Sequence, residues 1–170
     1  MLSNKLTFFS ALVLAFAATG FCEPTSKTLT IETESSFCLL MPPERGGDIA
    51  DNLHRSISFC TSGVSSVPDA KRFPDNFIQS SHLRKKTDRY IQVTGRIDRD
   101  AYDLDDDDEG GQNDPKHPVG ALCRDYPYFV QFIEPNDNIF CLRCCKNKSD
   151  CPTDRQYDGC RDVIGGNYDY

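Results

Sequence analysis

The stretch that decides the fold is YPYFVQFIEPNDNIFCLRC, residues 126–144. Aromatic and β-branched side chains fill residues 126–134, which is typical of a central strand. Pro135-Asn136-Asp137 is a turn signal, and the apolar run resumes after it in residues 138–144. These features predict a β-hairpin at the centre of the fold.

The segment RYIQVTGRI, residues 89–97, is the clearest further strand. Its apolar side chains alternate, so that Ile91, Val93 and Ile97 are expected on one buried side. Gly95 interrupts this pattern and predicts a bulge. The segment therefore predicts a strand that packs beside the central hairpin.

The N-terminal half predicts three shorter strands, at residues 28–33, 37–41 and 56–60. Residues 61–88 are mostly polar and contain two prolines, which predicts a long irregular loop. No long helical period and no internal repeat is present. We therefore expect a small, mostly β, single-domain protein.

Nine cysteines are present, and the eight beyond Cys22 can all pair: Cys38, Cys60, Cys123, Cys141, Cys144, Cys145, Cys151 and Cys160. Eight cysteines allow on the order of a hundred pairings, so the connectivity stays open. The adjacent Cys144 and Cys145 should bond to different partners. The spacing Cys141-x-x-Cys144 also fits a zinc site, but an oxidising compartment favours disulfides. We therefore expect a disulfide-stapled domain with no metal and no cofactor.

The first 22 residues have the pattern of a secretory signal peptide: a positive start, an apolar run and small residues. Cleavage after Gly20 or after Cys22 fits the small-residue rule, and cysteine parity favours Cys22. The apolar run is too short for a membrane span. We expect a signal peptide at 1–22 and a secreted, extracellular, cysteine-rich domain at 23–170.

Residues 98–114 hold nine acidic side chains and one arginine, which give this segment a formal charge of −8. The whole chain has a formal net charge of −7, so its acidity is concentrated in this segment. An EF-hand frame from Asp105 places Asp107 and Glu109 acceptably, but its twelfth position is Lys116 instead of a glutamate. Asp105, Asp107 and Glu109 are therefore weak calcium candidates. We interpret the segment as a mobile, solvated acidic loop.

The opposite charge gathers at Arg84, Lys85, Lys86 and Arg89. This cluster is interpreted as a solvated basic loop, with a nuclear signal used inside a host cell or a contact with a wall polymer as alternatives.

Asn147-Lys148-Ser149 is an N-glycosylation acceptor. It lies between two cysteines and should be exposed, so we expect Asn147 to carry a glycan.

No catalytic motif is present. The three histidines, His54, His82 and His117, have no recognisable catalytic spacing, and paired cysteines cannot act as nucleophiles. A small secreted hydrolase built on these histidines remains the alternative.

The central strand also carries four aromatic residues: Tyr126, Tyr128, Phe129 and Phe132. They could form a platform for a glycan, but aromatic residues of a strand more commonly belong to the core.

Several blocks carry a resemblance to a known family: TLTIETESSFCLLMPPERGGDIAD, YIQVTGRIDRDAYDL and YPYFVQFIEPNDNIFCLRCC. They resemble fungal secreted cysteine-rich proteins, some of which are labelled macrophage-activating glycoproteins. The chain is also similar to strigolactone-induced secreted proteins of arbuscular mycorrhizal fungi, which implies a role near plant roots. It departs from the family where it has GGQND instead of GGQYD, beside an unusually acidic run. The resemblance brings no catalytic residues.

These features together favour a non-enzymatic secreted effector that acts at a fungus–host interface and supports colonisation or symbiosis. Its expected partner is a host protein or a cell-wall glycan, with no nucleic acid, no membrane span and a monomeric state. The alternative is a structural or glycan-binding protein of the fungal wall or spore surface.

Overall fold

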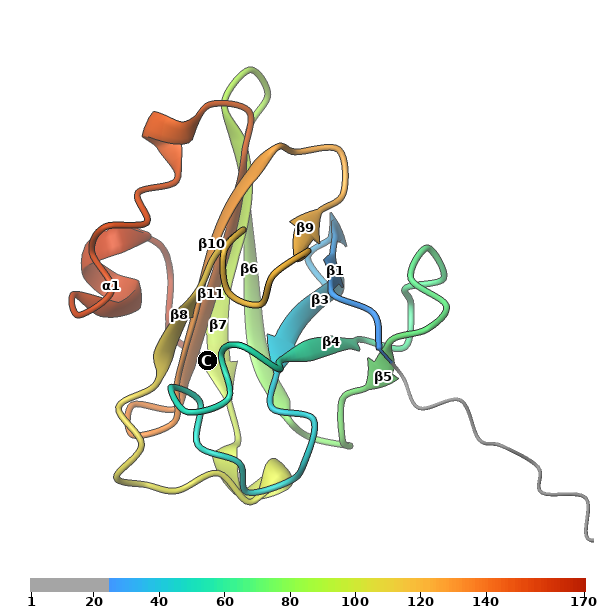
Figure 1. The fold of residues 1–170 in the computed structure, drawn as a ribbon, viewed down its shortest axis with the longest axis vertical. Coiled ribbons are helices and arrows are strands. Elements are labelled where there is room, and N and C mark those ends of the chain that lie inside the picture. The colour runs from blue at the N-terminus through green and yellow to red at the C-terminus, as the bar shows by residue number, and fades with distance from the viewer. Residues whose placement is uncertain (1–24) are drawn as a thin grey trace, which may run out of the picture.

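The centre of the fold is a five-stranded antiparallel sheet with the order β6-β7-β11-β10-β8 (Figure 1). The computed structural model describes residues 25–170, so the expected signal peptide lies outside the described residues. The strands of this sheet are β6 (Ile78–Lys86), β7 (Tyr90–Ile97), β8 (Gly111–Asn113), β10 (Tyr128–Glu134) and β11 (Ile139–Cys145). The central hairpin is confirmed, because β10 and β11 pair from Glu134↔Ile139 to Tyr128↔Cys145.

The N-terminal half forms a second sheet, with the order β2-β3-β4-β5. Its strands are β2 (Ile31–Thr33), β3 (Ser36–Met41), β4 (Ile57–Cys60) and β5 (Lys71–Arg72). A short parallel pair, β1 (Thr28–Leu29) with β9 (Leu122–Cys123), lies beside it. The helical elements are short: η1 (Arg99–Tyr102), η2 (Lys148–Asp150) and α1 (Gly159–Val163). The strands predicted at 37–41 and 56–60 are thus confirmed, whereas the segment predicted as one strand at 28–33 is divided into β1 and β2, which belong to different sheets.

Alternate residues of the central hairpin enter two different cores, because side chains alternate between the faces of a strand. Phe129 and Ile133 of β10 join the core between the two sheets, where Phe37 and Phe140 stack with ring centroids 5.4 Å apart. The intervening residue Phe132 joins a second core on the opposite face, covered by the C-terminal segment and α1 (Figure 1). Both faces of the hairpin are therefore buried, which explains its nearly continuous apolar sequence.

A buried glutamine joins the two sheets. Gln131 of β10 is fully buried, and its side-chain oxygen accepts a hydrogen bond from the Leu40 amide at 2.8 Å. Its side-chain nitrogen donates to the Leu40 carbonyl at 2.8 Å and to the Asn113 side-chain oxygen at 3.1 Å. The side chain thus satisfies the backbone of β3 as a neighbouring strand would.

The polar segment 61–88 differs from the predicted loop, because it contains β5 and the whole of β6. Strand β6 lies at the edge of the sheet and pairs with β7 on one side. Most of its side chains therefore stay exposed and carry no apolar alternation.

The bulge expected at Gly95 of β7 lies instead on β6, where the pairing register with β7 shifts between Ile78 and Ser80. A Cβ on Gly95 would lie 2.0 Å from the Ser80 carbonyl oxygen. Gly95 is therefore required by this close approach.

Four disulfides use all eight expected cysteines: Cys38–Cys60, Cys123–Cys144, Cys141–Cys160 and Cys145–Cys151. The adjacent cysteines point to opposite faces of β11, so Cys144 enters the first core and Cys145 the second. This confirms that they bond to different partners. The zinc alternative is wrong in this structure, because Cys141 and Cys144 are each consumed by a disulfide.

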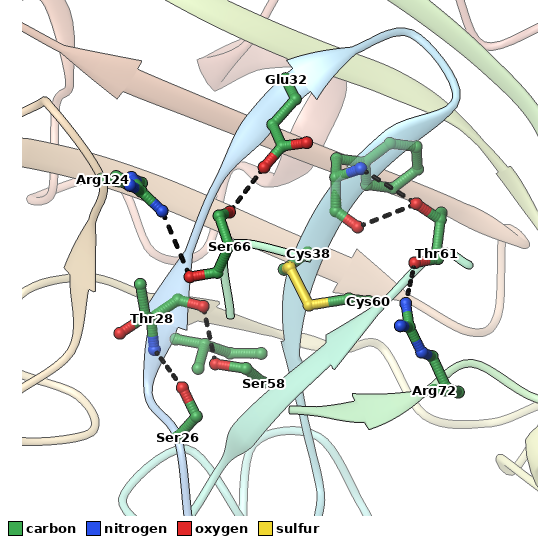
Figure 2. Close-up of a disulfide and its surroundings, with 12 residues drawn as sticks. Ser26, Thr28, Glu32, Cys38, Ser58, Cys60, Thr61, Ser66, Arg72 and Arg124 are labelled. Carbon is green, nitrogen blue, oxygen red and sulfur yellow. Dashed lines mark hydrogen bonds between the residues drawn. A yellow bond between two sulfur atoms is a disulfide. The ribbon is translucent and has the colours of Figure 1, made fainter. Parts of the chain in front are cut away.

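The Cys38–Cys60 disulfide joins directly opposite residues of β3 and β4 and clusters with Val64 and Val67, and hydrogen-bonded polar side chains lie around this region (Figure 2). The Ser58 hydroxyl donates to the Thr28 carbonyl at 2.8 Å, which ties β4 to β1. The Arg124 guanidinium donates to the Ser66 carbonyl at 3.2 Å. The expected class, a small, mostly β, disulfide-stapled single domain, is confirmed.

Candidate functional site

The acidic segment 98–114 is not solvated along its whole length, and our interpretation of it is wrong in this respect. Asp108 is only 7% exposed, and its carboxylate accepts hydrogen bonds from the amides of Ile49 at 2.9 Å and Gly110 at 2.8 Å. Asp114 is equally buried and accepts from the Lys116 amide at 2.7 Å. These carboxylates accept hydrogen bonds from backbone amides in loops, where a strand or helix would supply a carbonyl acceptor. Part of the acidic segment therefore stabilises the fold.

Burial raises the pKa of the Asp108 carboxyl, and the hydrogen bonds from Ile49 and Gly110 oppose this effect. The carboxylates of Asp48 and Asp105 raise the pKa further. Asp108 thus holds the acidic segment against the loop that follows β3, at the expense of bringing like charges together.

The three calcium candidates are not brought together as one set. Asp105 and Asp107 share a cluster with Asp106, in which carboxylate oxygens lie within 4.8 Å of one another. All three are exposed, and the Asp105 side chain already accepts a hydrogen bond from the Asp107 amide at 3.0 Å. Glu109 instead lines a separate cavity beside Glu134. This arrangement is an exposed acidic turn, in which Glu109 lies apart from Asp105 and Asp107.

The cavity beside Glu134 has a volume of about 310 Å³ and is strongly acidic. Four carboxylates line it: Glu109, Glu134, Asp137 and Asp158. Glu134 ends β10, is 8% exposed, and accepts a hydrogen bond from the Cys160 amide at 2.6 Å. The neighbouring Tyr157 is 92% exposed at the same cavity. A concave surface with carboxylates and an open aromatic ring suits a hydroxyl-rich or cationic ligand.

Burial raises the pKa of the Glu134 carboxyl, and the hydrogen bond from the Cys160 amide lowers it in part. The charge of Asp137 also raises this pKa, whereas the charge of Arg161 lowers it. Sequence reasoning missed this cavity, because its walls come from three separate segments: residues 109–111, the end of β10 with the turn after it, and the segment before α1. The Cys141–Cys160 disulfide ties α1 to β11, the partner strand of β10.

The histidines do not form one site. His82 lies on edge strand β6, whereas the loops that carry His54 and His117 lie beside β8 at the other edge. Asn113 shows that these two loops are neighbours, because its side chain donates to the carbonyls of both Leu53, at 3.5 Å, and His117, at 3.1 Å. The two edges are separated by four strand spacings, or about 19 Å. The structure therefore does not bring His82 close to the other two.

The aromatic residues expected either in a glycan platform or in the core do not share a face. Phe129 belongs to the core between the sheets, whereas Phe132 and Tyr128 belong to the core on the opposite face. Tyr126 is half-buried against the first core. The core interpretation is correct for Phe129 and Phe132, which are each 1% exposed, and a common platform is ruled out.

The basic cluster lies on a strand and its turn instead of a loop. Arg84, Lys85 and Lys86 are the last residues of β6, and Arg89 immediately precedes β7. All four side chains are exposed, as expected for a solvated cluster. This cluster therefore marks the tip of the β6–β7 hairpin, which projects at one end of the molecule (Figure 1).

The glycosylation acceptor Asn147 is exposed and lies immediately before η2, inside the short loop closed by Cys145–Cys151. Its side chain makes no hydrogen bond that caps η2. The asparagine is thus accessible in the folded chain, and its modification stays a prediction.

Within residues 25–170, no helix has both the length and the apolar character needed to span a membrane.

The chain is similar to two fungal proteins of Mycosarcoma maydis. It is 29% identical over 164 residues to appressorium protein ROW1, a match that covers 84% of this chain and 37% of ROW1. It is 30% identical over 157 residues to appressorium protein ROW2, covering 81% of this chain and 51% of ROW2. The chain thus spans about half the length, or less, of these relatives.

No family model matches the chain, and no solved structure matches it. The similarity to ROW1 and ROW2 therefore supports the expected relation to fungal proteins, but it supports neither the macrophage-activating nor the strigolactone-induced label. Over more than four-fifths of its length, the chain is a distant homologue of these fungal appressorium proteins.

Proposed function

We propose that this chain is a secreted, non-enzymatic effector that acts where a fungus meets its host and supports colonisation. The observation that carries the proposal is the similarity of more than four-fifths of the chain to two appressorium proteins. An appressorium is the cell with which a fungus enters a host. Support also comes from the four disulfides, which persist in the oxidising space outside cells.

The resemblance to strigolactone-induced secreted proteins refines this proposal towards symbiosis with plant roots. In that case the transcript should rise strongly when the fungus meets its host. Constant transcript levels in free-living hyphae and spores would contradict the refinement and favour a role in the fungal wall.

The test of the main proposal is deletion of the gene, followed by measurement of host colonisation. We expect colonisation to fall and to be restored by the full chain. A gene that lacks residues 1–22 should not restore it, which separates a role outside the fungal cell from one inside. Unchanged colonisation after deletion would overturn the proposal.

A second function, glycan binding at the fungal wall or spore surface, is favoured by the cavity beside Glu134. Its acidic walls and the exposed ring of Tyr157 suit a sugar with hydroxyl or amino groups. Retention of the purified protein on chitin or β-glucan, lost in Tyr157→Ala, would support this function. Protein found free in the culture fluid and not retained on either glucan or chitin would contradict it.

A further inference from the structure

Cations gather at one end of three neighbouring strands. Lys86 of β6 pairs with Tyr90 of β7, and Tyr90 pairs with Cys145 of β11, so the residues next to these positions share one end of the sheet. We call this surface the basic end, and it comprises Arg84, Lys85, Lys86, Arg89, Arg143 and Lys146. The acidic segment begins beyond Ile97, at the other end of β7 (Figure 1). The length of β7 separates the two by about 23 Å.

Three of these cations surround a single aromatic ring. The Arg143 guanidinium carbon lies 4.5 Å from the centroid of the Tyr90 ring, the Lys86 ammonium 5.6 Å and the Arg89 guanidinium carbon 6.0 Å. Arg143 is held in place, since its Nε donates to the Gln92 side chain at 2.9 Å and its Nη1 to the Asp150 carbonyl at 3.2 Å. The cluster is thus organised around the ring and not merely a set of free side chains.

The positive charge of this end is only partly neutralised. The buried Asp150 carboxylate pairs with Arg89. Four other cations take part in no ion pair among the residues that the structure describes: Arg84, Lys85, Lys86 and Lys146. Burial lowers the pKa of the Arg143 guanidinium, and the charge of Arg84 acts in the same direction. An anion placed here would therefore be stabilised by several cations at once.

The cations extend around both faces of the hairpin. Arg84 and Lys86 share the face of Tyr90 and Gln92, whereas Lys85 pairs opposite Ile91 and so faces the other way. On that second face, Lys85 lines a hollow together with Lys146 and Arg124, and the carboxylates of Glu32 and Asp125 line the same hollow. The basic end is therefore an open surface that wraps a projecting hairpin and not one closed pocket.

Protection of a sheet edge explains only part of this pattern. Lysine and arginine on an edge strand prevent unwanted pairing with another chain, which accounts for the three cations of β6. Arg143, however, lies on the inner strand β11, and Lys146 follows that strand. Arg143 packs on the Tyr90 ring, and Lys146 adds a cation on the opposite face of the hairpin. These two cations favour a surface that recognises an anion.

We propose that the basic end binds a polyuronate, an acidic polysaccharide whose repeated charges are carboxylates. Repeated anions on one chain match cations spread over two faces, and arginine pairs well with carboxylates. Tyr90 is 5% exposed, so it offers no open ring on which the bases of a nucleic acid could stack. The choice of a polyuronate rests on the proposed function, because such polymers fill the plant walls that an invading fungus meets.

The test measures retention of the purified, secreted protein on immobilised polygalacturonate at low and high salt. Fully methyl-esterified polygalacturonate is the matched ligand control, since it keeps the backbone and lacks the charges. The test variant is Arg84→Gln/Lys85→Gln/Lys86→Gln. The control variant, Arg55→Gln/Lys116→Gln/Arg161→Gln, removes the same charge from exposed cations elsewhere in the chain.

We expect binding to the free acid but not to the ester, and weakening by salt. The test variant should bind about tenfold more weakly, equivalent to about 1.4 kcal/mol, and the control variant should match the wild type. Equal retention on the ester, equal loss in both variants, or tighter binding to RNA or to phosphatidylserine vesicles would overturn the inference. A deletion strain that colonises normally would overturn the proposed function and leave this binding result unaffected.

Discussion

Replacing Gln131 by leucine should weaken the link between the two sheets without changing the apolar pattern of either. The substitution removes three hydrogen bonds and leaves the buried amide and carbonyl of Leu40 without the partner they have in the wild type. Each unsatisfied buried group costs about 1–3 kcal/mol. The extra apolar surface of leucine offsets about 1 kcal/mol. We therefore expect the free energy of unfolding to fall by about 3 kcal/mol.

The assay is equilibrium unfolding in urea with the disulfides intact, together with thermal unfolding. For a domain of this size, the expected loss corresponds to a fall in Tm of about 6–12 °C. Gln156→Leu, at an exposed glutamine, is the control and should change the unfolding free energy by less than about 0.5 kcal/mol. A loss below about 1 kcal/mol for Gln131→Leu would refute the idea that this side chain acts as a substitute strand.

Three further outcomes are expected. Burial raises the pKa of Glu134, so the folded state holds its proton more tightly than the unfolded state, and wild-type stability should fall as the pH rises through the raised pKa. Glu134→Gln keeps the acceptor for the Cys160 amide and should lack this contribution, seen as a smaller difference between unfolding free energies at pH 4 and pH 7. Asn147→Gln, secreted from a eukaryotic host, should lose one N-glycan by mass spectrometry, and an unmodified wild type would contradict the prediction. Replacing Cys123 and Cys144 by alanine opens a bridge with a sequence separation of 21 and should cost about 3 kcal/mol in urea unfolding; a loss under about 1 kcal/mol would contradict it.

The central hairpin was predictable because both of its faces are buried. Its aromatic and β-branched residues are required on alternate sides, so the sequence from Tyr128 to Cys145 carries a strong local signal. Strand β6 gave no such signal, because it has one neighbour and mostly exposed side chains. Edge strands of this kind depend on the partner strand for their formation, which a local pattern does not reveal.

The candidate sites were less predictable than the fold, for physical reasons that differ between them. Within the acidic run, Asp108 is buried because the Ile49 amide lies opposite it, and its charged neighbours in sequence give no sign of this contact. The cavity beside Glu134 depends on the Cys141–Cys160 disulfide, which is one of many pairings that the sequence allows. The basic end was visible as four charges, but the contribution of Arg143 required the register of β11 against β7.

The covering of the central sheet on both faces has a consequence for how this protein can diversify. Substitutions in β7, β10 and β11 alter one of two interiors, so these strands are tightly constrained. The turns and the outer edge of β6 make few such contacts and can change their charge or length at little loss of stability. Descendants of this fold can therefore acquire new partners at the rim of the sheet while its interior stays the same.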